Sequence, residues 1–269
     1  MLTLEHISAI IYALYIRGYM IIKLNIKQPT PTITSARVIP TTVVETEPVP
    51  VVKDEDELSD SAFGLIGGDP EVTPATHIES NSGVFDYELA SIKDTTLRAF
   101  TEEVLTKVPK YFYSVPASMS GNFHPAQTRC EGGLVIHTKA TIRVLFSIAR
   151  NSLLLTKLIG KPELTQSDLD ICVSAIILHD IVKYGTTDVA GKYDVGHHAS
   201  AMEFINKVID FDKYKEALTM IDVVLGCIYM HMGPWGKYPD GFNLNDSFKG
   251  LPILVEMSDY ISSLKIWEN

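Results

Sequence analysis

An apolar run that ends in an adjacent histidine and aspartate constrains the fold of this chain more than any other feature. The run extends from Ile171 to Leu178 and is followed directly by His179 and Asp180. Neighbouring side chains on a helix are offset by about 100°, so an imidazole and a carboxylate can approach one ion from two directions. A buried aspartate is costly unless a cation or strong hydrogen bonds match its charge. The pair therefore predicts a metal site at a buried helix end, with a capped or salt-bridged helix end as the alternative.

Three more candidate ligands lie on apolar helical patterns elsewhere in the chain. His137 falls on the apolar stripe of a helix predicted to begin near residue 132, where a hydrogen-bonded core histidine is the alternative. His231 follows an apolar helix that the next glycine and proline stop. Asp259 interrupts the apolar pattern of the last predicted helix, where an unpaired inward carboxylate would be expensive. One divalent cation explains all of these residues together, so we predict a single metal centre.

Two positions near this centre have open assignments. The adjacent histidines His197 and His198 begin a helix, where one could face inward and the other outward. Lys183 stands one turn after His179 and Asp180, so it either contacts a substrate phosphate or pairs with Asp180.

The ligand types predict which ions would bind. Imidazole and carboxylate ligands suit Mn, Mg, Fe, Co, Ni or Zn. The cysteines Cys130, Cys172 and Cys227 are widely separated and have no CxxC spacing, which indicates a reducing compartment and no structural zinc site. The formal net charge of −10 argues against a broad basic surface for long duplex nucleic acid.

The periodic pattern divides the chain into three parts. Residues 1–27 predict a short helix and strand, whose apolar run is shorter than the roughly 20 residues needed to span a bilayer; a membrane-surface or partner-binding segment is the alternative. Residues 28–84 are rich in proline, threonine and acidic residues and predict a disordered linker. Residues 85–269 predict an all-α bundle of at least five helices, the first ending before Pro109.

Several segments of the predicted bundle resemble the HD-domain metal-dependent phosphohydrolases. His137, the pair His179-Asp180 and Asp259 match the H…HD…D pattern of that superfamily in order and spacing. The resemblance is to a subgroup that includes HD-type 3'-5' exoribonucleases and many small hydrolases of phages and bacteria. The segments that carry the resemblance are Glu131–Thr138, Ile177–Lys183, Gly196–His197, His231–Gly236 and Ser258–Tyr260.

The resemblance implies an HD-domain helical bundle and a role for each matched residue. It assigns the first metal to His137, His179, Asp180 and Asp259. His197 and His231 match positions that hold a second metal or contact substrate; His197 is preferred over His198 because Ala201, four residues later, fits the small residue usual in the family. The sequence departs from the family pattern at Val182, where glycine is usual, and at Met232, where a second histidine is frequent.

The implied activity is hydrolysis of a phosphoester in a nucleotide or a short single-stranded oligonucleotide by a metal-activated water. Lys183 and His124 are candidates for phosphate contact or acid/base chemistry, with a loop histidine as the alternative for His124. Trp235 would either stack on a nucleobase or close the core. The expected setting is the cytoplasm, a host cytoplasm if a phage encodes the chain, and an oligomer is compatible with the sequence. The alternatives are a metal-stabilised binding or regulatory module and a 3'-5' nuclease, which the acidic charge disfavours.

Overall fold

The computed structural model describes residues 83–120, 124–239 and 250–265, which all fall in one of the two units of the chain. Within these ranges the fold is all-α and contains no strand, so the predicted fold class is confirmed. The segment predicted over residues 1–27 and nearly all of the linker predicted over residues 28–84 lie outside the described residues.

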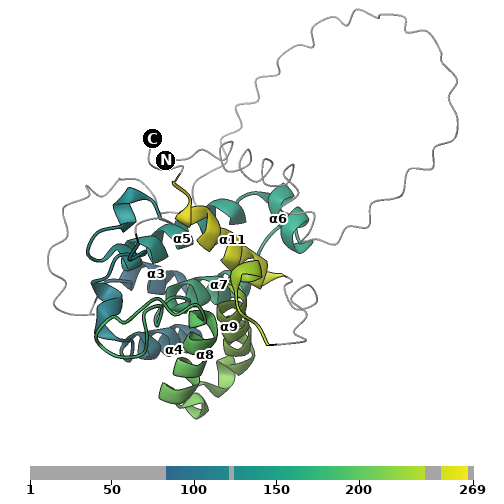
Figure 1. The fold of residues 1–269 in the computed structure, drawn as a ribbon. Helices are drawn as coiled ribbons and strands as arrows, with labels where there is room; N and C mark the ends of the chain where they lie inside the picture. The colour runs from purple at the N-terminus through teal and green to yellow at the C-terminus, as the bar shows by residue number, and fades with distance from the viewer. Residues whose placement is uncertain (1–82, 121–123, 240–249, 266–269) are drawn as a thin grey trace, which may run out of the picture. The chain divides into compact units, whose positions relative to one another are not determined.

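The helices are named here in chain order, as they are labelled in Figure 1. They are α3 (Asp86–Ser91), α4 (Thr95–Leu105), α5 (Gly133–Ala149), α6 (Ser152–Ile159), α7 (Gln166–Leu178), α8 (His197–Val208), α9 (Leu218–Met230) and α11 (Leu251–Ser263). Short 3-10 helices lie between them: η2 (Lys110–Tyr113), η3 (Ala126–Thr128), η4 (Phe211–Ala217) and η5 (Gly233–Trp235). None of the helices in the described ranges combines the length and the apolar character that crossing a bilayer requires.

Helix α7 lies at the centre of the bundle (Figure 1) and packs against α3, α4, α5, α9 and α11. It is buried along its whole second half because its residues are apolar on every side. Thr165 starts it with a capping box: its side chain accepts from the backbone N–H of Asp168, and the Asp168 carboxylate accepts from the N–H of Thr165. The helix ends at Leu178, so His179 and Asp180 project from the middle of the core.

The single helix predicted before Pro109 is instead two helices, α3 and α4. Asp94 caps α4, because its side chain accepts a hydrogen bond from the backbone N–H of Leu97. The carboxylate of Asp170 on α7 accepts from the backbone N–H groups of Lys93 and Asp94, at 3.0 and 2.7 Å. These bonds satisfy the N–H groups that the break leaves without helical partners.

A close backbone approach fixes the start of α5. A Cβ atom on Gly133 would lie 2.0 Å from the carbonyl oxygen of Thr128, so only glycine fits there. Gly132 precedes it with a φ of 71°, in the left-handed region. His137 follows one turn into the helix, and α5 packs along α11, the helix that carries Asp259.

Candidate metal centre

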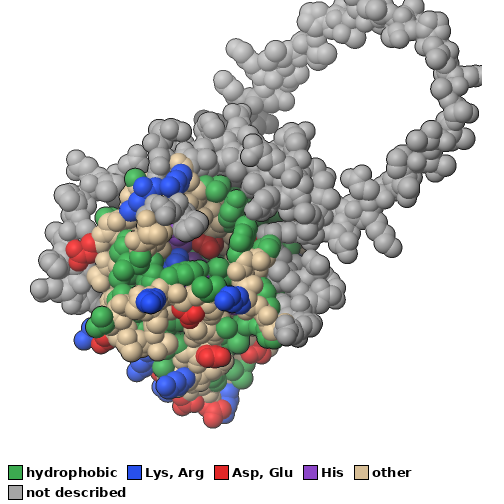
Figure 2. All heavy atoms as spheres, in the orientation of Figure 1, with side chains coloured by type: hydrophobic (Ala, Val, Ile, Leu, Met, Phe, Trp, Pro, Cys, Tyr) green, Lys and Arg blue, Asp and Glu red, His purple; other side chains and the backbone are tan. Residues whose placement is uncertain are grey.

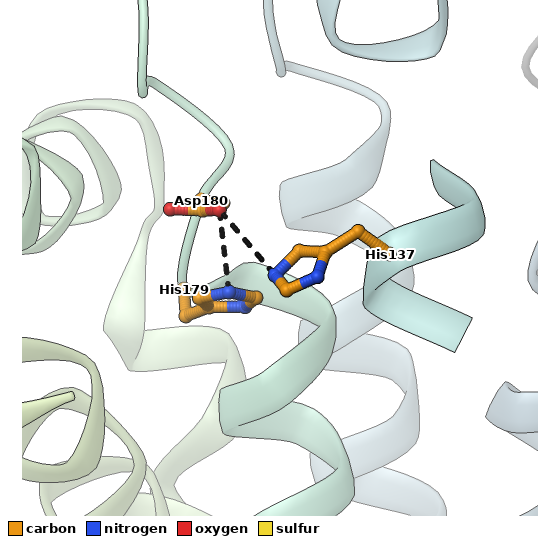
Figure 3. Close-up of side chains that lie close together, drawn as sticks. All are labelled: His137, His179 and Asp180. Atoms are coloured by element: carbon orange, nitrogen blue, oxygen red, sulfur yellow. Dashed lines mark ion pairs between the residues drawn. The ribbon is translucent and has the colours of Figure 1, made fainter. Parts of the chain in front are cut away.

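Six of the predicted ligands meet in one cluster, although they come from five separate helices or helix ends. They are His137 on α5, His179 and Asp180 after α7, His197 at the start of α8, His231 after α9, and Asp259 on α11. All are buried except Asp259, whose side chain is 22% exposed. Figure 3 shows His137 and His179 turned toward the carboxylate of Asp180, with their Nε2 atoms 4.0 and 3.4 Å from its Oδ2.

The backbone fixes the orientation of three of these imidazoles. His179, His197 and His231 hold Nδ1 at 2.6, 2.8 and 2.7 Å from the carbonyl oxygen of the residue three positions earlier. Because a carbonyl only accepts, each Nδ1 carries a proton, and Nε2 presents a lone pair whenever the ring is neutral. Metal-binding histidines use this arrangement, in which a hydrogen bond at one nitrogen orients the other toward the ion.

The Nε2 atoms form two overlapping groups around Asp180. One group consists of His137 and His179 with Asp180. The other consists of His197 and His231 with Asp180. Within each group all the ligand atoms lie within 4.8 Å of one another. His197 and His231 place their Nε2 atoms 3.0 and 3.8 Å from Oδ1 of Asp180, so the two carboxylate oxygens face different pairs of imidazoles.

Asp259 completes the side of the cluster that His137 occupies. Its Oδ1 lies 2.8 Å from Nε2 of His137 and 3.6 Å from Nε2 of His179. The other ring nitrogen of His137 lies 3.3 Å from the hydroxyl of Ser262, which itself donates to the backbone carbonyl of Asp259. The hydroxyl oxygen of Ser262 can therefore accept a hydrogen bond from Nδ1–H of His137, which leaves Nε2 to face the carboxylates.

The cluster leaves buried polar atoms that only another group could satisfy. Among the described residues, Nε2 of His137, Nε2 of His179 and Oδ1 of Asp180 have no hydrogen-bond partner. Their short distances to neighbouring nitrogens and oxygens thus lack hydrogen-bond geometry. Buried polar atoms without partners are rare and costly. Lone pairs that converge without hydrogen bonds fit the ligands of a cation.

Lys183 places a positive charge next to the buried carboxylate of Asp180. Its ammonium lies 2.7 Å from Oδ2 of Asp180, so it makes one of its two predicted contacts, the pair with that carboxylate. Burial would raise the pKa of Asp180, but Lys183 and His179 hold it well below its usual range. Burial would likewise lower the pKa of His179, yet the carboxylates of Asp180 and Asp259 raise it to about 10. For His231, burial and the neighbouring histidines keep the pKa well below its usual value.

His124 lies beside the cluster, as its predicted role requires. Its ring packs edge-on against that of His137, with centroids 4.7 Å apart, and it is 8% exposed. Burial, His137 and Lys183 lower its pKa to about 3, so the imidazole is neutral. Its Nδ1 has no hydrogen-bond partner among the described residues.

The two adjacent histidines take different places, and neither is exposed. His197 joins the cluster, whereas Nε2 of His198 lies 3.1 Å from the backbone oxygen of Lys237. The His198 ring packs between the rings of Tyr229 and Tyr238, with centroid distances of 5.5 and 5.1 Å. The expectation that one histidine faces outward is wrong, because this aromatic pocket buries His198 completely.

Trp235 does not close the core, which corrects one of its two predicted roles. It is 45% exposed and stacks on Tyr260, with ring centroids 5.4 Å apart and planes 12° from parallel. Trp235 is the last residue of η5 and lies at the surface against Tyr260 of α11, the helix that carries Asp259.

Sequence patterns missed three residues that support the cluster. Ser262 is one. Asp194 accepts from the backbone N–H of Gly196 and the hydroxyl of Ser200, at 2.8 and 2.6 Å, and so shapes the turn that orients His197. Its place three residues before a helix was the available signal. The ring of Tyr193 packs against that of His197 in a tilted arrangement, with ring centroids 5.5 Å apart. The residues around Tyr193 in the sequence give no signal of this contact.

In Figure 2, histidine, acidic and basic side chains lie in a recess of the displayed face, bordered mainly by hydrophobic side chains. Comparison with family models, curated proteins and solved structures found no match for this chain. The described residues thus contain a buried histidine and aspartate cluster that could hold a metal ion.

Proposed function

We propose that this chain is a metal-dependent phosphohydrolase of the HD type, which cleaves a phosphoester bond of a nucleotide or short oligonucleotide with a metal-activated water. One observation carries the proposal: oriented Nε2 lone pairs converge on a shared buried carboxylate, Asp180, whose Oδ1 has no hydrogen-bond partner among the described residues. The resemblance of the H…HD…D pattern to the HD superfamily supports it further.

The residues present fit one or two divalent ions. His137, His179, Asp180 and Asp259 would hold the first, and His197 and His231 would complete a second with Asp180 between the two. A bound ion lowers the pKa of its water and polarises a phosphoryl oxygen. Mixed imidazole and carboxylate ligands suit Mn, Fe, Co, Ni, Zn or Mg.

Lys183 and His124 supply complementary groups beside the centre. An ammonium has three N–H donors, and Lys183 directs one of them to Asp180. The others can bind oxygens of the substrate phosphate. His124 is neutral because burial lowers its pKa to about 3, so it serves as a hydrogen-bond partner for a sugar hydroxyl or a leaving-group oxygen.

The size of the substrate follows from charge. A formal net charge of −10 disfavours the basic track that holds a long polymer. A single nucleotide or a short strand needs only the local cation, Lys183 and one stacking surface. Trp235, half-exposed near Asp259, is the proposed surface for the base.

The test is hydrolysis of a panel of NTPs, dNTPs, cyclic nucleotides and short RNA or DNA with added Mn, Mg, Co or Ni. Wild type is compared with Asp180→Ala and with Asp222→Ala, a matched aspartate on the exposed side of α9. We expect metal-dependent turnover by wild type and Asp222→Ala, and none by a folded Asp180→Ala. Metal binding without turnover of any substrate would support the metal-stabilised binding module instead.

A further inference from the structure

The segment between α7 and α8 places a tyrosine at the metal centre that no ligand pattern includes. Tyr193 is 47% exposed, and its ring lies 5.5 Å from that of His197 and 6.4 Å from that of Tyr184. His197 in turn contacts the carboxylate of Asp180 at 3.0 Å. The phenol is thus one side chain away from the predicted ligands and still reaches solvent.

Backbone hydrogen bonds hold this segment in place on both sides of Tyr193. The N–H of Asp194 donates to the carbonyl of Lys183 at 3.0 Å, and the N–H of Gly191 donates to the carbonyl of Tyr184 at 2.8 Å. The first bond ties Asp194, the residue after Tyr193, to Lys183, which carries the buried ammonium. The relative positions of Lys183 and Tyr193 are therefore set by the fold.

A second tyrosine braces the start of the segment. The hydroxyl of Tyr111 accepts from the backbone N–H of Tyr184 and donates to the carbonyl of Gly185, at 3.0 and 2.7 Å. Because both ends of the segment are anchored, placing the Tyr193 ring costs little further conformational entropy when a ligand binds.

The hydroxyl of Tyr193 is available as a donor. Within the described residues it makes no hydrogen bond to the protein, whereas the buried tyrosine hydroxyls Tyr111, Tyr113 and Tyr184 all donate to backbone carbonyls. Burial raises the pKa of Tyr193, Lys183 lowers it, and Asp180 and Asp259 raise it again, with a net increase. A phenol has an ordinary pKa of about 10, so it carries its proton at neutral pH and can donate a hydrogen bond.

We propose that Tyr193 is a substrate-binding residue whose hydroxyl donates a hydrogen bond to a phosphate oxygen that Lys183 also contacts. This inference rests on the proposed function and names the group that the recess recognises, a tetrahedral oxyanion. A neutral donor beside a cation adds direction to the attraction, because a hydrogen bond to a charged oxygen is short and aligned.

The test compares Tyr193→Phe, which removes only the hydroxyl, with Tyr87→Phe, a matched control on α3 that is 54% exposed. The probe is inorganic phosphate, titrated into each protein loaded with Mn²⁺, together with KM and kcat for the best substrate of the panel. We expect Tyr193→Phe to weaken phosphate binding and to raise KM by about tenfold, the effect of one hydrogen bond to a charged group. Its kcat and Mn²⁺ affinity should match those of wild type, and Tyr87→Phe should match wild type throughout.

Two results would overturn the inference: unchanged phosphate affinity in Tyr193→Phe, or a loss of Mn²⁺ affinity that accounts for the weaker phosphate binding. The failure of the proposed function looks different. If wild type binds Mn²⁺ and phosphate but hydrolyses no phosphoester, the hydrolase proposal fails. In that case a tenfold loss of phosphate binding in Tyr193→Phe would still support an oxyanion site.

Discussion

The Nε2 atoms of His197 and His231 lie 3.1 Å apart, while both rings direct Nδ1 to a backbone carbonyl. With each Nδ1 protonated, neither neutral ring has a hydrogen to donate across that gap, so two lone pairs face each other. Either a proton or a cation must lie between them. The carboxylate oxygen of Asp180 at 3.0 Å from His197 favours a cation there.

Binding of a metal ion should release a proton. The carboxylates raise the pKa of His179 to about 10, so this ring is protonated at pH 8, but it must be neutral to coordinate an ion. Apparent affinity for Mn²⁺ should therefore rise as pH increases toward about 10 and level off above it. Calorimetric titration at pH 8 in two buffers with different ionisation enthalpies should show about one proton released per ion. Equal heats in the two buffers would contradict this account of His179.

The two adjacent histidines should differ in their effect on metal binding. His197→Gln should weaken Mn²⁺ binding by more than about 100-fold, because the loss of a ligand exceeds the 10–100-fold effect of losing a group that orients one. His198→Gln should lower thermal stability, since the buried ring is lost, yet keep the Mn²⁺ affinity of wild type. Equilibrium dialysis of the folded variants measures both affinities. Equal losses in the two variants would show that the cluster does not distinguish the two positions.

Ser262 should matter for the metal although it is not a ligand. Ser262→Ala removes the hydroxyl 3.3 Å from Nδ1 of His137 and should lower Mn²⁺ affinity by about 10–100-fold. Ser263→Ala is the matched control, because its hydroxyl donates only to the backbone carbonyl of Tyr260. The two variants can be compared by metal-dependent shifts in melting temperature. Identical shifts would remove Ser262 from the support of His137.

The start of α5 should tolerate no side chain. A Cβ on Gly133 would lie 2.0 Å from a backbone oxygen. Gly133→Ala should therefore lower the free energy of unfolding by about 1–3 kcal/mol. Gly226→Ala on α9 meets nothing closer than 3.9 Å and should raise it by about 0.5–1 kcal/mol, because alanine is the better helix former. Chemical denaturation of both variants measures the difference. A neutral Gly133→Ala would mean that α5 can begin elsewhere.

Sequence reasoning found the ligand candidates because each one breaks an apolar helical pattern. His137 and Asp259 interrupt helical sequences that are mainly apolar, where a buried polar side chain needs a partner. The N-cap of α7 was also predictable, since Thr165 and Asp168 have the spacing of a capping box. Periodicity and the cost of burial both act over a few residues, so they can be recognised without a structure.

Features that depend on distant contacts could not be predicted. The break between α3 and α4 depends on the Asp170 carboxylate, 76 positions from Asp94, which accepts the freed N–H groups. The burial of His198 depends on Tyr229 and Tyr238, which approach it only after α8 and α9 have packed together. Tyr193 gives no local signal either, because its relation to the centre arises from the path of the chain between α7 and α8.

The most direct test of the central claim is the rate of phosphoester hydrolysis measured against added Mn²⁺, for wild type and for Asp180→Ala. The account predicts that the wild-type rate saturates over the concentrations at which Mn²⁺ binds, and that folded Asp180→Ala stays inactive at every concentration. A wild-type protein that binds Mn²⁺ but hydrolyses none of the substrates would contradict a catalytic centre, as would an Asp180→Ala variant with unchanged activity.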